Sequence, residues 1–272
     1  MSLIYACIAP HAGDLIPETI TDQNIVKVTR QSMQEMGKHL QALNPEVLVI
    51  ANPHGFRVQN AMSISIAERA VADWSPEVKL DFEMDSSLAN TIADKANEMN
   101  VPIVRYIYGA SGGPECFIPL DWGAVVPLYF MGHHFEPKPK LVHLSPMRLL
   151  PYATHYEFGR AIGRVIQESE ARIAFIASAD QGHAHDANGP YGFDPAAAAY
   201  DVWMQDVIRA NRLDDLLSAD AELVENGMPD SLWPTLILAG VLKENPMAAQ
   251  FLSYEVNVYF GILCAQFIAE NS

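Results

Sequence analysis

The stretch that decides the fold is Glu46-Val-Leu-Val-Ile-Ala-Asn-Pro-His-Gly55, in which a run of apolar, partly β-branched residues leads directly into a proline, a histidine and a glycine. A short apolar run bounded by turn-forming residues is typical of a strand that is covered on both faces. Pro53 and Gly55 end this strand at the point where His54 would project. Because ligands in open α/β sheets bind beyond the carboxyl ends of the strands, His54 is a candidate functional residue.

The N-terminal part of the chain repeats this arrangement. The apolar run Leu3–Ala9 is followed by Pro-His-Ala-Gly-Asp, which places His11 just beyond a second predicted strand. Between the two runs, apolar residues recur every three to four positions over 25–43, which predicts an amphipathic helix and thus a β-α-β unit. The strands of such a unit are parallel, so we expect His11 and His54 at the same edge of the sheet. A single histidine of this kind is more often structural, but two at matching strand ends favour a metal or catalytic site.

The rest of the chain mixes strand and helix patterns. We expect one domain over residues 1–272, with an α/β fold in which a central, mostly parallel or mixed sheet is flanked by helices. The predicted strands are 62–66, 79–82, 101–106, 124–130, 140–145, 172–178 and 251–255, and the predicted helices are 86–98, 158–166, most of 195–243 and a final apolar helix ending near residue 269.

Composition excludes some classes of partner. Lys plus Arg is 17 and Asp plus Glu is 33, which gives a formal net charge of −16 and disfavours binding to nucleic acid or to an anionic membrane. No secretory signal is apparent, and the longest apolar stretches fall far short of the roughly 20 residues that cross a bilayer. Cys7, Cys116 and Cys264 are odd in number and widely spaced in apolar surroundings. They indicate buried, reduced thiols and a cytoplasmic location.

Several short motifs together carry a resemblance to a known family. The motifs and their order along the chain resemble those of the LigB-type class III extradiol ring-cleavage dioxygenases of the MEMO-like superfamily. The likeness extends over nearly the whole chain. The motifs are Pro10-His11, Asn52-Pro-His-Gly55, Asp121-Trp-Gly123, Ser178-Ala-Asp-Gln-Gly-His183, Gly189-Pro-Tyr-Gly-Phe193 and Ser253-Tyr-Glu255.

The resemblance implies an iron(II) site and a catecholic substrate. By motif, the metal ligands are His11, His54 and Glu255, and zinc or another divalent metal could occupy the site in the isolated protein. Two imidazoles and one carboxylate leave open positions on iron at which a catechol and dioxygen can bind together. His183 is the implied acid–base residue, and His185 is the alternative because it lies only two positions away. The family also implies a homo-oligomer and a small helical partner subunit.

Other interpretations of these residues remain open. Glu255 could simply be a carboxylate near a helix N-terminus, where the helix dipole favours it. A His-His-Glu set also suits the catalytic zinc of a hydrolase. The metal-free MEMO branch keeps the fold as a binding scaffold, although this chain retains all three ligand types.

The chain also departs from the family pattern. Trp122 stands where many relatives have a histidine, and Gln181-Gly182 replaces a common Leu-Ser. Indole offers one N–H donor and no acceptor, so Trp122 either forms an apolar wall of the substrate pocket or packs as core beneath the strand predicted at 124–130. The ring substituent of the substrate is left open by this difference.

Overall fold

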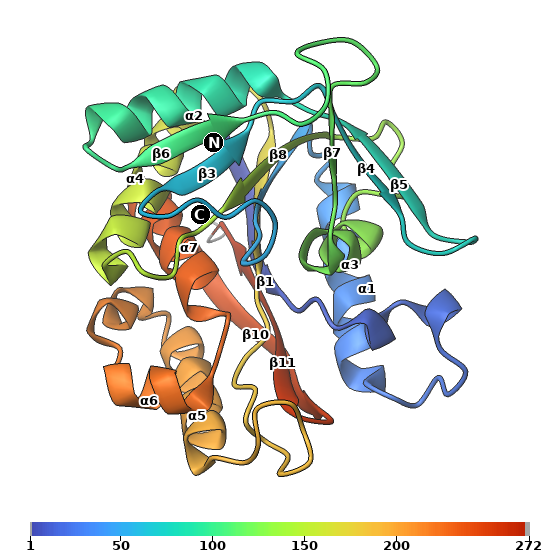
Figure 1. Cartoon of the computed structure of the whole chain (residues 1–272), viewed down its shortest axis with the longest axis vertical. Helices are drawn as coiled ribbons and strands as arrows, with labels where there is room; N and C mark the ends of the chain where they lie inside the picture. The colour runs from blue at the N-terminus through green and yellow to red at the C-terminus, as the bar shows by residue number, and fades with distance from the viewer. Residues whose placement is uncertain (1, 270–272) are drawn as a thin grey trace.

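The computed structural model describes residues 2–269 and contains one large mixed sheet flanked by helices (Figure 1). Within these residues the sheet has eight strands in the order β10-β11-β1-β9-β2-β8-β3-β6. The strands β1, β9, β2 and β8 are parallel neighbours, whereas β11 and β3 add to them antiparallel. The bounds are β1 Leu3–Ala9, β2 Val47–Ala51, β3 Met62–Ser65, β6 Ile103–Tyr106, β8 Lys140–Ser145, β9 Ile173–Ser178, β10 Ala248–Asn257 and β11 Phe260–Ile268.

A smaller sheet and the helices complete the fold. The second sheet has the order β5-β4-β7, with β4 Arg69–Asp73, β5 Lys79–Glu83 and β7 Phe117–Pro119. The α-helices are α1 Lys27–Ala42, α2 Ser86–Glu98, α3 Trp122–Phe130, α4 Tyr152–Glu168, α5 Pro195–Arg209, α6 Ala221–Gly227 and α7 Leu232–Glu244, and short 3₁₀ helices span Gly13–Leu15, Pro17–Thr19 and Leu213–Ser218.

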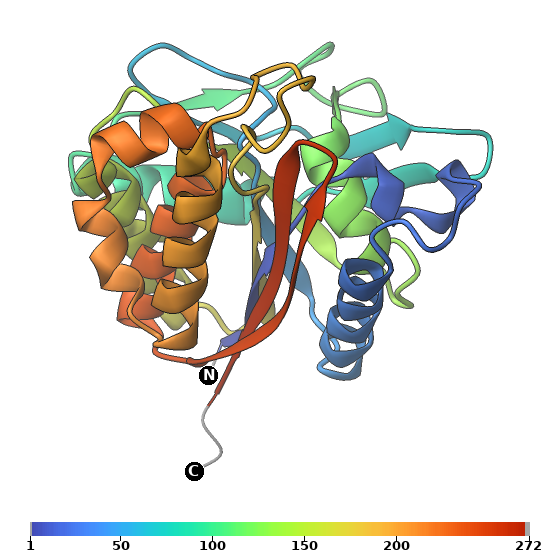
Figure 2. The ribbon, with the colours of Figure 1, turned by 90° about the horizontal axis from the view of Figure 1, so that it is seen from below.

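Both faces of the main sheet are covered, which explains the continuous apolar run of β2. Val47, Val49 and Ala51 pack in a core cluster with residues of α2, α4, α5 and α7. Leu48 and Ile50 point to the other face and pack with α1, α3 and the smaller sheet. Figure 2 shows these two helical layers on opposite sides of the strands. The α/β fold class predicted from the sequence is therefore confirmed.

The β1-α1-β2 unit has parallel strands, as the sequence predicts, but β9 lies between them. Ile176 of β9 pairs with Cys7 of β1 on one side and with Ile50 of β2 on the other. The ends of three adjacent parallel strands therefore meet at one edge, and they lead to His11, Asp180 and His54 respectively.

Two predicted elements are wrong. The residues 124–130 lie in the helix α3, and the predicted C-terminal helix is the strand β11, which forms a hairpin with β10. Both segments are apolar on all sides, because α3 is buried in the core and β11 packs into both core clusters. An apolar run without a polar face has no period that separates helix from strand.

The three cysteines are free and buried, as the sequence predicts. Among the helices of residues 2–269, none combines the length and the apolar character needed to pass through a membrane.

Candidate metal centre and active-site cavity

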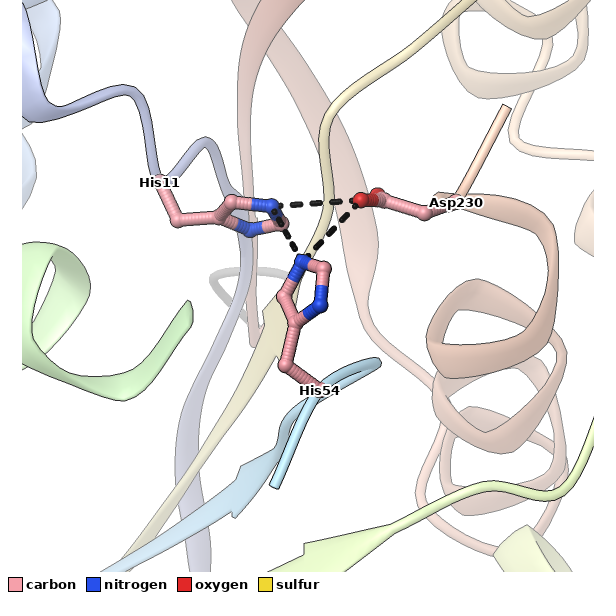
Figure 3. Close-up of side chains that lie close together, drawn as sticks. All are labelled: His11, His54 and Asp230. Carbon is pink, nitrogen blue, oxygen red and sulfur yellow. Dashed lines mark hydrogen bonds and ion pairs between the residues drawn. The ribbon is translucent and has the colours of Figure 1, made fainter. Parts of the chain in front are cut away.

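His11 and His54 converge at the carboxyl edge of the main sheet, as the parallel strands predict (Figure 3). Their Nε2 atoms are 3.3 Å apart. A carboxylate completes the group, because Oδ2 of Asp230 lies 3.2 Å from His11 Nε2 and 3.4 Å from His54 Nε2. Within the described residues, these three side chains offer one ligand atom each at mutual distances that a single metal ion could bridge.

The structure does not bring Glu255, the third ligand that the resemblance implies, to this group. Glu255 lies on β10 and contacts the first turn of α1, where its Oε2 accepts hydrogen bonds from Thr29 N and Thr29 Oγ1, both at 2.6 Å. Helix α1 begins without a side-chain cap from Val26, so the carboxylate supplies one. The alternative interpretation, a carboxylate that stabilises a helix N-terminus, describes its position.

Asp230 was missed by the sequence analysis. It stands in Met228-Pro-Asp-Ser231, immediately before the apolar helix α7, where an aspartate is typical of a helix start. Asp230 is held in place from β9, because the backbone N–H of Asp180 donates to its Oδ1 at 2.9 Å. Asp180 in turn accepts the backbone N–H of His11 at 3.0 Å. Asp180, which follows β9, therefore holds two of the candidate ligands, His11 and Asp230, in place.

The hydrogen bonds of His11 test whether it can bind a metal. Its Nδ1 lies 2.9 Å from Ser178 Oγ, and that hydroxyl donates its one proton to the carbonyl of Gly123. Ser178 Oγ must then accept from Nδ1–H, which leaves the lone pair of a neutral imidazole on Nε2, the atom that faces Asp230. The tautomer, the buried setting and the donor set of two nitrogens and one oxygen fit a divalent metal of the 2-His-1-carboxylate type.

The electrostatics of the site also favour a cation. Burial alone would lower the pKa of His11, but the negative charges of Asp180 and Asp230 outweigh it and raise this pKa to about 9. Burial would raise the pKa of Asp230, but the charge of His11 and hydrogen bonds from His11 and His54 hold it well below its ordinary value. Burial, reinforced by repulsion from Asp230, raises the pKa of Asp180. Two buried carboxylates thus face the space between the imidazoles, and positive charge there stabilises them.

The N-terminus of α3 packs against the turn that carries His54. Asn52 Oδ1 accepts the backbone N–H of His54 at 3.0 Å, and Asn52 Nδ2 donates to Asp121 Oδ1 at 2.9 Å. A Cβ on Gly123 would lie 2.1 Å from Asn52 Oδ1, so only glycine allows this approach. The ring of Trp122 lies 4.5 Å from that of His54, between centroids, and is 47% exposed. Trp122 therefore lies beside the metal-binding candidates rather than in the core.

A cavity of about 360 Å³ opens over these residues, a volume that suits a small aromatic molecule. His183 lies on its wall, where its ring stacks on Phe260 with centroids 5.3 Å apart and planes 13° apart. The cavity is lined by His11, Ala12, His54, Arg57, Trp122, Arg148, Asp180, His183, Tyr191, Met228, Asp230, Tyr259 and Phe260.

The structure separates the two histidines that the sequence analysis left as alternatives. His185 does not line the cavity. Its Nε2 lies 2.9 Å from Oδ2 of the buried Asp201, which also accepts the hydroxyl of Tyr254 at 2.6 Å. His183 makes no side-chain hydrogen bond of this kind, and its Nδ1 is buried without a partner among residues 2–269. The geometry thus favours His183 for contact with a substrate and His185 for holding the loop.

Comparisons with known proteins agree with this description. The crystal structure of the uncharacterized protein JW3007 from Escherichia coli K12 is similar in fold, with a TM-score of 0.63 and 18% sequence identity over 97% of this chain and 99% of that one. The curated Protein CA_C1420 of Clostridium acetobutylicum is 24% identical over 270 residues, which are 97% of this chain and 57% of that protein. This chain therefore spans little more than half the length of that relative. The model of the family described as the catalytic LigB subunit of aromatic ring-opening dioxygenase matches residues 5–262, so the chain belongs to the LigB family.

Proposed function

We propose that this protein is a non-haem iron(II)-dependent extradiol dioxygenase that cleaves a catecholic ring with dioxygen. The observation that carries the proposal is the convergence of His11, His54 and Asp230 on the floor of a ring-sized cavity whose wall holds a further histidine, His183. Membership of the LigB family supports the same reaction class.

Three side chains would hold the metal in this proposal. His11 and His54 contribute neutral imidazole nitrogens, and Asp230 contributes one carboxylate oxygen. Ferrous iron held there would supply a Lewis acid for the catechol oxygens and a route for electron transfer between the ring and dioxygen. Ser178 and Asp180 keep His11 in the required tautomer and orientation.

His183 would handle the protons. It lines the cavity without belonging to the group of His11, His54 and Asp230, so it can accept the proton of a catechol hydroxyl and return it later in the reaction. Phe260 stacks on one face of its ring and fixes the plane of the imidazole. Trp122, Tyr191 and Tyr259 supply aromatic surface around the substrate and displace water from it.

The test combines metal analysis with oxygen uptake. Protein purified anaerobically and loaded with ferrous iron should consume dioxygen with at least one member of a catechol panel and give a ring-opened product. The zinc-loaded protein is the matched control, because zinc occupies similar sites but has no redox chemistry. Hydrolysis of esters or amides by the zinc form, with no oxygen uptake by the iron form, would overturn the proposal in favour of a hydrolase. Failure to retain any divalent metal would leave a binding scaffold.

A further inference from the structure

A second cavity borders the turn that carries His54. Its volume is about 410 Å³, and it shares no lining residue with the cavity over the candidate metal centre. Neighbouring residues of the chain alternate between the two cavities. His54 and Trp122 line the first cavity, whereas the adjacent Gly55 and Asp121 line the second. The turn after β2 and the N-terminus of α3 therefore contribute to both.

Most of the wall of the second cavity is apolar, and several of its side chains are exposed. Phe56 and Tyr106 stack with their ring centroids 4.6 Å apart and their planes 25° apart. Phe56 is half exposed, and Tyr108 is 62% exposed. The remaining apolar lining consists of Ile107, Ile118, Pro119 and Leu120. Exposed apolar side chains that gather around a cavity are typical of a surface that binds a ligand.

One carboxylate, that of Asp121, lines this apolar cavity. Its Oδ1 accepts a hydrogen bond from Asn52 Nδ2 at 2.9 Å. Asp121 is the N-cap residue of α3, but its side chain accepts no hydrogen bond from that helix. Among residues 2–269, no lysine or arginine lines the cavity. The second oxygen of Asp121 is therefore available to a cationic ligand.

His143 also lines the cavity, but it does not supply the missing positive charge. Burial lowers its pKa to about 4, although the charge of Asp121 opposes this effect, so the ring is neutral near pH 7. Asn52 Nδ2 donates to His143 Nε2 at 3.1 Å. The proton of the neutral ring is then on Nδ1, which lies 3.2 Å from the hydroxyl of Tyr106. Both ring nitrogens are thus occupied within the protein, and Asp121 is left for the ligand.

The aromatic faces of this cavity are also free of the protein's own cations. The cation–π contacts in the part of the chain that the structure describes join Lys138 to Phe82, Arg148 to Trp233 and Arg209 to Phe251. None of them involves Phe56, Tyr106 or Tyr108. Aromatic rings attract organic ammonium ions to their faces, and a nearby carboxylate adds a charge-assisted hydrogen bond.

We propose that the second cavity binds an organic ammonium ion with an apolar body, of the arylalkylamine class. The ammonium group contacts the carboxylate of Asp121 and the ring faces of Tyr106 and Tyr108, and the apolar body fills the rest of the cavity. The formal net charge of −16 favours a cationic ligand as well. This binding site is separate from the candidate metal centre and does not depend on the proposed reaction.

The test compares a cation with its neutral analogue. The purified whole chain is titrated in a calorimeter with 2-phenylethylamine and with the nearly isosteric 2-phenylethanol. The wild type should bind the amine more tightly than the alcohol. Asp121→Asn keeps an oxygen that can accept from Asn52 but removes the charge. It should weaken binding of the amine by about 10- to 100-fold and leave binding of the alcohol almost unchanged.

Tyr108→Leu tests whether the amine lies in this cavity rather than beside the carboxylates of the candidate metal centre. The substitution keeps an apolar side chain but removes an aromatic face, so it should weaken binding of the amine by about two- to fivefold. Binding of the alcohol should change less. Because Tyr108 is largely exposed, its replacement should leave the fold intact.

Asp85→Asn is the matched control. Asp85 is also half-buried and also precedes a helix, α2, but it does not line the cavity. Its replacement should leave both affinities unchanged. Thermal melting of each variant identifies a loss that comes from unfolding, and Tyr108→Leu decides the question if Asp121→Asn does not fold.

Two results would overturn the proposal. The first is equal affinity of the wild type for amine and alcohol, or a preference for the amine that survives in Asp121→Asn. The second is a preference that Asp121→Asn removes but Tyr108→Leu leaves intact, because the ammonium group would then not lie against the aromatic wall. Neither result bears on whether the iron-loaded protein opens catechol rings.

Discussion

Two carboxylates, Glu255 on β10 and Asp230 before α7, behave differently, although both lie beside the start of a helix. Oε2 of Glu255 accepts two hydrogen bonds from Thr29 in the first turn of α1. Asp230 uses Oδ1 to accept the N–H of Asp180 and directs Oδ2 to the two imidazoles. The same functional group thus stabilises a helix in one region and completes a candidate metal centre in the other.

The difference shows that the partner atoms, and not the residue type, decide what a carboxylate does. At Glu255 the hydrogen-bond donors belong to the first turn of α1, which has no side-chain acceptor from its N-cap residue. At Asp230 the neighbouring atoms are the ring nitrogens of His11 and His54. Only a proton or a metal ion can link the lone pair of such a nitrogen to a carboxylate oxygen.

The largest expected effect is loss of metal from Asp230→Ala. Loss of an outer-shell partner typically costs 10- to 100-fold in metal affinity, so removal of a ligand should cost more than about 100-fold. The measurement is a competitive titration of ferrous or zinc ion against a chelator. Glu255→Ala is the control and should bind metal as the wild type does. The reverse result would restore Glu255 as the ligand and refute the assignment of Asp230.

The second effect concerns the two histidines of the loop after β9. His183→Gln should retain iron but lower kcat by roughly 10²- to 10⁴-fold, which is the usual contribution of general acid–base catalysis. His185→Gln should leave kcat much closer to wild type, because His185 contacts Asp201 rather than the cavity. Equal losses in both variants would argue that the loop conformation, and not the His183 imidazole, limits the rate.

The sequence predicted the backbone of the site better than its chemistry. The apolar runs that end in Pro-His place His11 and His54 correctly, because strand patterns and parallel connections are local properties. Asp230 lies 176 residues beyond His54, since 230 − 54 = 176, in a segment that has the pattern of an ordinary helix start. Its role depends on where α7 packs against β9, and no local pattern contains that information.

The errors in secondary structure have the same origin. Residues 124–130 and the segment 260–268 were assigned to the wrong element because most residues of each are apolar and buried, which hides the period. The wrong assignment of β11 as a helix also concerned the site, because the turn of the β10–β11 hairpin follows Glu255. That turn brings Tyr259 and Phe260 to the cavity, where Phe260 stacks on His183.

A smaller effect is expected at Trp122, whose ring lies against His54 at the cavity wall. Trp122→His and Trp122→Phe should change the order of kcat/KM values across a panel of substituted catechols by several-fold, because they alter the apolar wall. Their melting temperatures should stay close to wild type, since the indole is half exposed. An unchanged substrate order with a large drop in melting temperature would show that Trp122 acts only in packing.

The smallest effect concerns the stability of α1. Glu255→Gln keeps an oxygen that can accept from Thr29 but removes the negative charge from the helix N-terminus, so it should lower the free energy of unfolding by about 0.5–1 kcal/mol. Glu255→Ala also leaves the Thr29 N–H without its acceptor and should cost about 1–2 kcal/mol. The measurement is urea unfolding of the metal-free protein, with the midpoint shifted and the slope unchanged.

Thr29→Val makes the comparison sharper, because it removes the hydroxyl that donates to Glu255 while keeping the side-chain shape and the backbone N–H. If Glu255 acts by capping α1, the double variant Thr29→Val with Glu255→Ala should lose less stability than the sum of the two single losses. Additive losses would mean that the two residues stabilise the fold independently. Metal affinity should be unchanged in all three variants, since Thr29 and Glu255 lie outside the candidate metal centre of His11, His54 and Asp230.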